Sequence, residues 1–224
     1  ILDEILNKLP TKQCCHGFVQ QRSIKTNAEM HVNKTQVLCM DIHNFFPSIN
    51  INQVFEVFHC VGYTSDVAQA LAQLCTHNAI LPQGAPTSPT LANIIFSPID
   101  QQILNAISTK EITYTRYADD LIFSSSHELD FLIPLVSEII STYGFEINSN
   151  KTHLMKNPYR KMITGLIVTD TVKIPKYYKR KFNQELFYCE KYGVASHLKN
   201  CKTRSTSSFQ SNTYRLSPRL FVIS

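Results

Sequence analysis

Apolar residues recur along this 224-residue chain with two different periods, which predicts a mixture of strands and helices. Residues 36–42 form an almost continuous apolar run, typical of a strand that is buried on both faces. Apolar side chains at helical spacing predict a helix end at residues 1–10 and helices over 51–59, from 64 onward, from 88 to about 108, and over 128–143. The pattern therefore predicts a domain of the α+β class.

The last third of the chain continues this mixture over shorter distances. Short apolar runs predict strands at 145–148 and 150–155, and a hairpin formed by 162–168 and 172–174. From Pro175 onward, basic residues alternate with large apolar ones at helical spacing. We expect an amphipathic helix there, with one basic face and one apolar face.

Glycine and proline mark the ends of several elements. Gln83-Gly84 predicts a loop in which the backbone can approach a ligand closely. Ser88-Pro89 has the residue types of an N-cap and first helical position, and Gly144 those of a helix C-terminus.

Two adjacent carboxylates lie in the middle of residues 112–124, between two runs rich in Ile, Thr, Tyr and Phe. These runs predict a strand, a turn and a second strand, with Asp119 and Asp120 at or beside the tip. Neighbouring acids repel, and a divalent cation removes that penalty. Mg²⁺ favours one or two carboxylates together with substrate phosphates. Taken alone, the pair also fits a solvated acidic hairpin.

A third carboxylate, Asp41, comes at the end of the apolar run 36–42. A carboxylate at the end of a buried strand is costly unless it is paired or coordinates a metal, although an Asp there can also cap the next segment. If folding brings Asp41 beside Asp119 and Asp120, the three carboxylates can hold two cations for in-line phosphoryl transfer. The sequence shows no Ser/His/Asp or Cys/His arrangement that would indicate another chemistry.

The charge of the chain is divided unevenly. Residues 1–150 have a balance of −7 and residues 151–224 a balance of +12, within a net charge of +5. So basic a segment usually contacts a polyanion, although a basic solvated surface is the alternative.

The composition also indicates the cellular compartment in which the protein works. No apolar run reaches 18 residues, and the N-terminus lacks the pattern of a signal peptide. The seven cysteines form no C-x-x-C pair, which suits a reducing cytoplasm and argues against a disulfide framework or a zinc site.

The motifs taken together resemble those of reverse transcriptases. Residues 117–120 (YADD) resemble the Y-x-D-D box, 41–49 (DIHNFFPSI) the motif of the first catalytic aspartate, and 83–89 (QGAPTSP) the Q-G-x-x-x-S-P loop of bacterial enzymes. Residues 27–31 (NAEMH) and 163–165 (ITG) resemble the N-A-x-x-H and V-T-G elements of retron reverse transcriptases, with Ile in place of Val. The similarity runs from about His16 to Tyr192.

The resemblance implies roles for individual residues. Implied metal ligands are Asp41, Ile42, Asp119 and Asp120, and Asp120 acts more as electrostatic support than as a direct ligand. The implied nucleotide site consists of Arg22 on the triphosphate, Ile42, Phe46 beneath the sugar, where it excludes ribonucleotides, and Gln83 and Gly84. Lys151 is positioned to protonate the pyrophosphate.

Alternatives remain for several of these residues. Phe46 can be a core side chain, Arg22 and Lys151 can be surface charges, and His31 can be a structural histidine. The expected RNA-binding residues, including those of the basic helix, are Asn27, His31, Thr164, Gly165, Lys176, Lys179 and Arg180.

The implied fold is a right-hand polymerase palm, an antiparallel sheet packed on helices. We expect partial fingers at 1–35, a palm with inserted fingers helices at 36–160, and a primer-grip-like hairpin with a mainly helical basic thumb at 161–224. The implied cofactor is Mg²⁺, as two ions, with Mn²⁺ as a substitute.

The implied activity is RNA-directed DNA synthesis in the bacterial cytoplasm, away from membranes and in anti-phage defence. Expected partners are a structured non-coding RNA template and its short DNA product, deoxynucleoside triphosphates, and an effector or toxin protein. Two alternatives stay open. One is a group II intron-like or other defence-associated reverse transcriptase, and the other is a nucleic-acid-binding scaffold of a defence complex.

Overall fold

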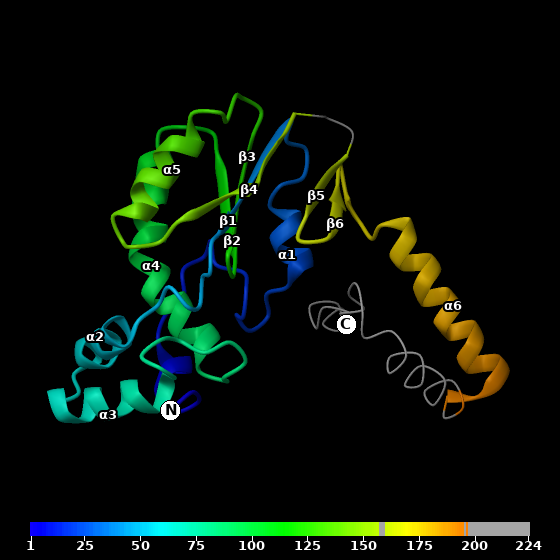
Figure 1. The fold of residues 1–224 in the computed structure, drawn as a ribbon. Coiled ribbons are helices and arrows are strands. Elements are labelled where there is room, and N and C mark those ends of the chain that lie inside the picture. Colours follow the sequence, from blue (N-terminus) through cyan, green and yellow to red (C-terminus); the bar gives the residue numbers. More distant parts are fainter. Residues whose placement is uncertain (157–159, 195, 197–224) are drawn as a thin grey trace.

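The computed structural model describes residues 1–156, 160–194 and 196, and the part of the expected thumb that lies beyond them is outside the described residues (Figure 1). Its elements are η1 (Leu6–Lys8), α1 (Ile24–Glu29), β1 (Gln36–Ile42), α2 (Ile51–Val61), α3 (Ser65–Cys75), α4 (Ser88–Ile107), β2 (Thr113–Tyr117), β3 (Asp120–Ser125), α5 (Leu132–Ser141), β4 (Ile147–Met155), β5 (Lys161–Ile163), β6 (Leu166–Val168), β7 (Val172–Lys173) and α6 (Lys176–Tyr192).

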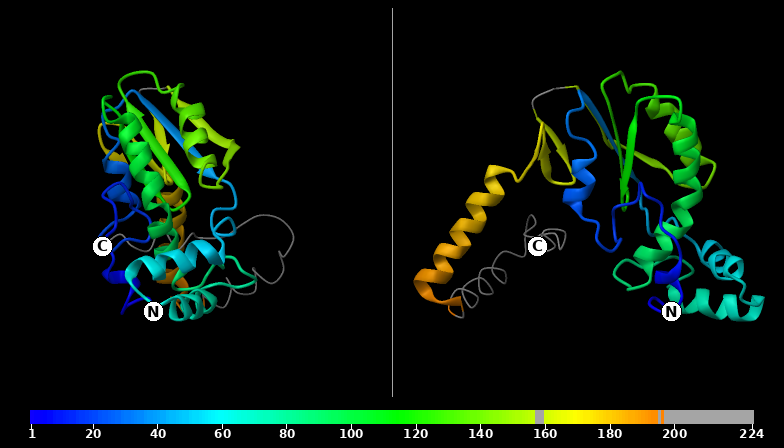
Figure 2. Two further views of the ribbon diagram at one scale, coloured as in Figure 1. Left: turned by 90° about the vertical axis from the view of Figure 1, so that its left-hand side faces the viewer. Right: turned by 180° about the vertical axis from the view of Figure 1, so that it is seen from behind.

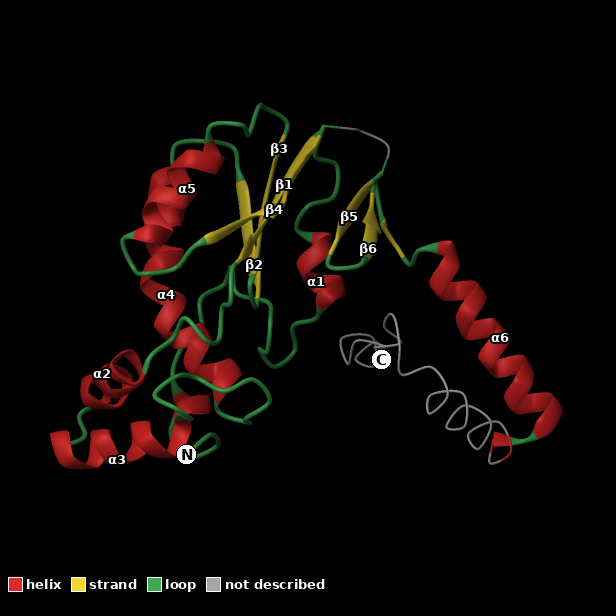
Figure 3. Ribbon diagram, viewed as in Figure 1, coloured by secondary structure: helices red, strands yellow, loops and turns green. Residues whose placement is uncertain are grey.

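The centre of the molecule is a four-stranded antiparallel sheet in the order β2-β3-β1-β4 (Figure 3). β1 is an inner strand with buried residues on both faces, as its apolar run predicts. A β-bulge interrupts its pairing with β4 between Cys39 and Asp41. Such a bulge bends the strand and re-aims the side chains next to it. Here it lies directly before the aspartate that ends the apolar run.

The two faces of the sheet have different coverings. Helices α4 and α5 cover one face, where Leu38, Met40 and Phe123 join the main hydrophobic core (Figure 1). α1 and a second, three-stranded sheet, β5-β6-β7, cover the other, where Val37 and Ile122 join a smaller core. Because side chains alternate along a strand, residues two apart share a face. The predicted α+β class, an antiparallel sheet packed on helices, is confirmed.

A buried lysine fastens the second sheet to the first. Lys161 of β5 is only 2% exposed, and its Nζ donates a hydrogen bond to the carbonyl of Lys34, just before β1. Burial lowers the pKa of Lys161. The β5–β6 turn lies beside the start of α1, where the Thr164 hydroxyl is 3.4 Å from the Ile24 carbonyl.

α6 follows β7 and projects from the rest of the described chain, as the right-hand view of Figure 2 shows. None of its residues is buried. Its exposed side chains include Tyr177, Phe182 and Phe187. The predicted basic amphipathic helix is therefore present, and its apolar positions face outward within the described part of the chain. No described helix is long and apolar enough to span a bilayer.

Several predicted boundaries were wrong. Residues 1–10 contain a short 3₁₀ helix, Leu6–Lys8, rather than the end of an α-helix, and Leu6 is the residue of that turn that is buried. α5 begins at Leu132 instead of residue 128. The reason is Pro134, which has no N–H and is tolerated in a first turn but breaks a helix interior. Ser88 is the first residue of α4 rather than its cap, which is Thr87.

The predicted boundaries of the strands in the last third of the chain were also wrong. Residues 147–155 form the single strand β4, because its residues pair along β1 on both sides of the bulge. The expected hairpin at 162–174 is a three-stranded meander whose β5–β6 turn is formed by Thr164 and Gly165, with φ of 45° and 85°. Two consecutive left-handed residues are typical of the tightest antiparallel hairpins.

Candidate active site

The three aspartates singled out in the sequence meet at one end of the central sheet. Asp41 of β1 is the register partner of Asp120 of β3, and directly opposed residues of antiparallel strands have Cα atoms about 4.5–5.5 Å apart. Asp119 lies in the β2–β3 turn, where its carbonyl accepts the Ile42 amide at 3.0 Å. Asp41 and Asp120 line one cavity with Cys39 and Ile122, so they share the face that α1 covers. Folding thus brings two carboxylates side by side and the third next to them.

Lys151 of β4 reaches Asp41 from the side of β1 opposite to β3. Its Nζ lies 3.1 Å from both carboxylate oxygens of Asp41. The hydrogen bond to Asp41 raises the pKa of Lys151, and the charges of Asp119 and Asp120 add to the effect. Because the lysine side chain is 61% exposed, water screens this ion pair and its net contribution to stability is small. Lys151 is therefore protonated at neutral pH and is free to exchange partners.

A cavity of about 440 Å³ opens in front of these groups. It is lined by Ile24 of α1, Cys39 and Asp41 of β1, Asp120 and Ile122 of β3, Lys151 and His153 of β4, Met162, Thr164 and Gly165 of the second sheet, and Tyr178 of α6. The walls thus come from every layer on this side of the sheet. Thr164 and Gly165, expected to bind RNA, lie in the same cavity as the carboxylates.

The side chains at this end of the sheet supply only some of the ligands that a divalent cation needs. Among the described residues, no three His, Cys, Asp or Glu side chains are grouped closely enough to surround one ion. Mg²⁺ does not require such a group, because it is usually bound by one or two carboxylates plus waters and substrate phosphates. Asp41, with Asp119 in the adjoining turn, can supply hard oxygen donors, and Asp120 adds a negative charge beside Asp41. The donor set therefore suits an ion that arrives with a phosphate ligand.

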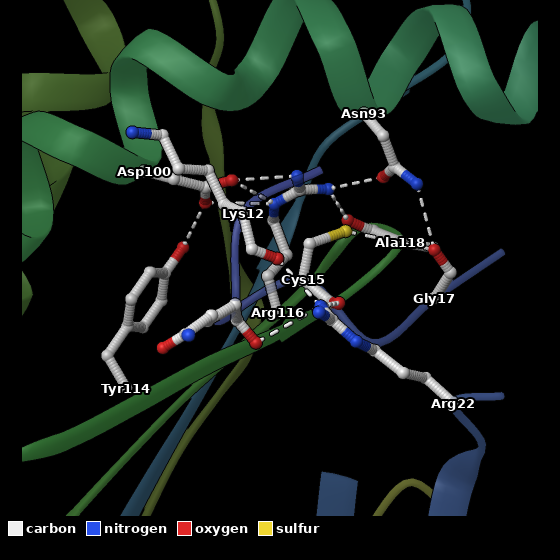
Figure 4. A network of polar contacts seen from close by, with 10 residues as sticks. Lys12, Cys15, Gly17, Arg22, Asn93, Asp100, Tyr114, Arg116 and Ala118 are labelled. Carbon is white, nitrogen blue, oxygen red and sulfur yellow. Dashed lines mark hydrogen bonds and ion pairs between the residues drawn. The ribbon is translucent and has the colours of Figure 1, made fainter. Parts of the chain in front are cut away.

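A buried ionic network holds the aspartate turn from the opposite face of the sheet (Figure 4). The Arg116 guanidinium and the Asp100 carboxylate of α4 are both fully buried and 2.8 Å apart. Arg116 also donates to the Asn93 side chain at 3.0 Å and to the Ala118 carbonyl at 3.2 Å. Ala118 is the residue before Asp119, so Arg116 connects the aspartate turn to α4.

Gly17 closes the network from the side of the N-terminal loop. Its carbonyl accepts a hydrogen bond from the Asn93 amide at 2.9 Å. A Cβ at Gly17 would lie 2.4 Å from the Ala118 nitrogen, a distance that would require backbone movement. Ala118 itself has a left-handed φ of 57°. Glycine is thus needed here because two backbone segments touch.

None of the expected nucleotide residues lines the cavity in front of the aspartates, and the structure places each of them separately. Phe46 is half-buried and packs edge-to-face on Phe45, whose ring is buried, with centroids 5.5 Å apart. Its ring is therefore not simply part of the core. Gln83 and Gly84 are exposed in the loop before α4, and Gly84 has a φ of 94°. Their contact with a nucleotide stays a prediction.

Arg22 is placed differently from a free phosphate ligand. Its Nη1 donates to the backbone carbonyls of Lys12 at 2.7 Å and Gln13 at 3.2 Å, and to that of Cys15. These bonds tie the loop after Gly17 to the segment before it. Binding of the triphosphate by Arg22 stays a prediction. It would use the guanidinium N–H groups that do not donate to these carbonyls.

Direct RNA contact by Asn27 and His31 does not agree with the structure, because both side chains are fully buried. The His31 ring lies between two hydroxyls, Ser124 Oγ at 2.6 Å and Thr115 Oγ1 at 2.7 Å. It joins α1 to β2 and β3. The Asn27 amide has no hydrogen-bond partner among the described residues. By contrast Lys176, Lys179 and Arg180 are all exposed on α6.

Sequence reasoning missed the residues that hold the site in place, Gly17, Asn93, Asp100 and Arg116. One signal was present. Asp100 falls between apolar residues on the inner face of a helix, and a buried carboxylate needs a cationic partner. Its partner is 16 residues away in sequence and could not be named without the fold.

Comparison with known proteins identifies the family to which the chain is similar. A family model for reverse transcriptase (RNA-dependent DNA polymerase) matches residues 1–183. The retron Ec86 reverse transcriptase of Escherichia coli is 34% identical over 208 residues, which cover 89% of this chain and 64% of the relative. The retron Mx65 reverse transcriptase of Myxococcus xanthus is also 34% identical, over 77% of this chain and 45% of its own. A solved structure of apo telomerase from Candida tropicalis aligns with 62% of this chain and 35% of its own, at a TM-score of 0.49 and 16% identity.

The buried imidazole makes the stability of the fold sensitive to acid. Burial lowers the pKa of His31 from 6.5 to about 3. The unfolded chain therefore binds this proton more tightly than the folded one, and stability falls as the pH drops from about 6.5 toward 3, by up to about 1.4 kcal/mol per pH unit. We expect His31→Gln to lose less unfolding free energy than wild type between pH 7 and pH 5, measured by urea denaturation. His59→Gln, at an exposed helix position, should keep the wild-type slope, and an unchanged slope in His31→Gln would contradict the assignment.

Proposed function

Because the chain belongs to the reverse transcriptase family, we propose that it is an RNA-directed DNA polymerase of retron type, which copies part of a bound structured RNA into a short single-stranded DNA. The chain spans less than two thirds of the length of each of the two retron relatives compared above, so the activity of the whole protein is part of the proposal. The observation that carries it is the pairing of Asp41 with Asp120 across β1 and β3, beside Asp119 and Lys151.

The family uses divalent metal ions, and we propose Mg²⁺, as two ions, with Mn²⁺ able to replace it. Asp41, Asp119 and the Ile42 carbonyl would hold them, with Asp120 as electrostatic support. When bound, the ions activate the attacking hydroxyl and stabilise charge on the leaving pyrophosphate. The contribution of the chain is position: antiparallel pairing sets Asp41 against Asp120, and the Arg116 network fixes the turn that carries Asp119.

Lys151 is the proton donor of this proposal. Its hydrogen bond to Asp41 raises its pKa, so the ammonium form persists at neutral pH and can give a proton to the leaving pyrophosphate. Its exposure leaves the side chain able to turn from Asp41 toward the substrate. Phe46, Gln83, Gly84 and Arg22 would contact the sugar, base and triphosphate of the incoming deoxynucleotide.

The RNA would lie across the cavity and α6. Thr164 and Gly165 present backbone at the cavity wall, and Lys176, Lys179 and Arg180 present charge on the first two turns of α6. Phosphate contacts of this kind position a nucleic acid without reading its sequence. The DNA product, an effector or toxin protein and a role in anti-phage defence in the bacterial cytoplasm complete the proposal.

Removing one carboxylate should separate synthesis from binding. We expect Asp119→Asn to reduce primer extension with Mg²⁺ by more than about 100-fold, because even residues that only support metal ligands are worth about 10- to 100-fold. Folding and RNA affinity should stay close to wild type, since the amide has nearly the same shape. Asp66→Asn, which neutralises an exposed acid of α3, is the control and should extend normally. Near-normal extension by Asp119→Asn would contradict the proposed two-metal site.

The contact of Gly17 with the aspartate turn predicts a second effect on activity. Gly17→Ala forces the backbone away from Ala118, and we expect it to cost about 1–3 kcal/mol of stability and to reduce primer extension at temperatures where the variant is folded. Gly62→Ala is the matched control. Gly62 has a φ of 109° with nothing within 4 Å, so this change strains a helix end far from the turn. The Gly62→Ala variant should be less stable than wild type but keep its activity. Equal activity of Gly17→Ala and Gly62→Ala would contradict the prediction.

The basic helix should act through charge. Lys176→Ala with Lys179→Ala is expected to weaken binding to cognate and scrambled RNA alike. It should also reduce the slope of log affinity against log salt by about one unit for each RNA phosphate that the variant no longer neutralises. The control is Lys8→Ala with Lys110→Ala, two exposed lysines outside α6. Filter binding across a salt series measures both quantities, and an unchanged slope in the α6 variant would remove α6 from the RNA surface.

A further inference from the structure

Phe18 has a conformation and an exposure that the fold does not account for. Its backbone has a φ of 61°, in the left-handed region that non-glycine residues rarely adopt, and Gln21 in the same loop has the same φ. Its ring is 49% exposed, so it contributes little to the hydrophobic core. Strained residues of this kind persist where their surroundings impose them, and they cluster at functional sites.

The loop that carries Phe18 is fixed at both ends. On one side the Gly17 carbonyl accepts the Asn93 amide of α4, and Gly17 lies against Ala118 of the aspartate turn (Figure 4). On the other side Arg22 is bound to the carbonyls of Lys12 and Gln13. The position of Phe18 is thus set relative to the catalytic turn, and its exposure does not reflect a loose end.

Phe18 is the outermost member of a chain of aromatic rings that ends at the core. Its ring meets that of Phe46 at a centroid distance of 6.3 Å and an interplanar angle of 62°, an edge-to-face contact. Phe46 in turn packs on Phe45, and the Phe45 ring contacts Phe96 at 5.7 Å inside the core. Phe46 is therefore held on one side by the buried Phe45 and on the other by the exposed Phe18.

We propose that Phe18 is a positioning residue for sugar selection, which holds the Phe46 ring in place against the sugar of the incoming nucleotide. This inference rests on the proposed function and on the contact of Phe46 with the sugar. An aromatic side chain can exclude a 2′-hydroxyl only if it does not rotate away, because a small rotation of the ring opens enough space for one oxygen. Phe45 blocks rotation toward the core. Phe18, on a rigid loop, blocks rotation toward solvent.

The test is a double-mutant cycle on nucleotide choice. Wild type, Phe18→Ala, Phe46→Val and the double variant are compared by kcat/KM for a deoxynucleotide and the matching ribonucleotide in primer extension. We expect Phe18→Ala to lower the preference for the deoxynucleotide at least about fivefold and Phe46→Val to lower it further. The double variant should be no less selective than Phe46→Val alone, because Phe18 acts through Phe46 and coupled residues are not additive.

Three further variants make the result specific. Phe18→Tyr keeps the ring and should retain the wild-type preference, whereas Phe18→Leu keeps apolar bulk without a flat ring and should reduce it in part. The Leu variant also replaces Phe18→Ala in the cycle if the latter does not fold in a thermal melt. Phe131→Ala removes a comparably exposed ring at the start of α5 and should leave the preference unchanged.

The possible failures are distinguishable. An unchanged preference in Phe18→Ala, or an effect that adds in full to that of Phe46→Val, overturns the role of Phe18 while DNA synthesis by wild type still supports the proposed function. If Phe46→Val itself leaves the preference unchanged, sugar selection lies elsewhere and the inference fails. A folded wild type that makes no DNA overturns the proposed function and this inference with it.

Discussion

The arrangement of the site depends on one buried ion pair, between Arg116 of β2 and Asp100 of α4, both completely inaccessible to water. Burial alone would lower the pKa of Arg116, but the charge of Asp100 and its hydrogen bonds outweigh that effect and the pKa is raised. Each charge is also supported by neutral groups, since Tyr114 donates to Asp100 at 2.7 Å and Arg116 donates to Asn93. Removing one partner of such a pair typically costs about 3–5 kcal/mol, because the other is left buried and unpaired.

A buried ion pair stabilises a fold less than a hydrophobic cluster of the same volume can, so its value lies in what it specifies. Arg116 has enough donors to join four structural pieces: α4, the end of β2, the carbonyl of Ala118 and, through Asn93, the loop at Gly17. Asp119 follows Ala118 directly in the sequence, and Phe18 follows Gly17. The aspartate turn and the loop that carries Phe18 are therefore both connected to the same buried ion pair.

Local patterns in the sequence predicted most elements and the place of the three aspartates, because strand and helix periods, caps and the aspartate motifs all act over a few residues. They did not predict what depends on distant partners. For His31 the sequence left two roles open, an RNA contact and a structural histidine, and the structure agrees with the second. The ring is buried between hydroxyls 84 and 93 residues away in sequence. α5 begins four residues later than the apolar pattern predicts, because Pro134 is tolerated in a first turn but not in a helix interior. Long-range pairing also decided that 147–155 is one strand, since the bulge opposite Asp41 absorbs the irregularity.

The distribution of charge bears on how a metal ion and a nucleotide would bind at the site. Asp41 is already paired with Lys151, and the described residues hold no ready group of three ligands, so a metal ion alone finds a half-satisfied site. The phosphate oxygens of a nucleotide would supply further ligands, and a bound ion would offset the repulsion between those phosphates and the carboxylates. On the proposed function, metal and nucleotide therefore bind as one unit. The segment after residue 150, which has a balance of +12, would attract the phosphates of an RNA, whereas the carboxylates would receive the nucleotide through the ion.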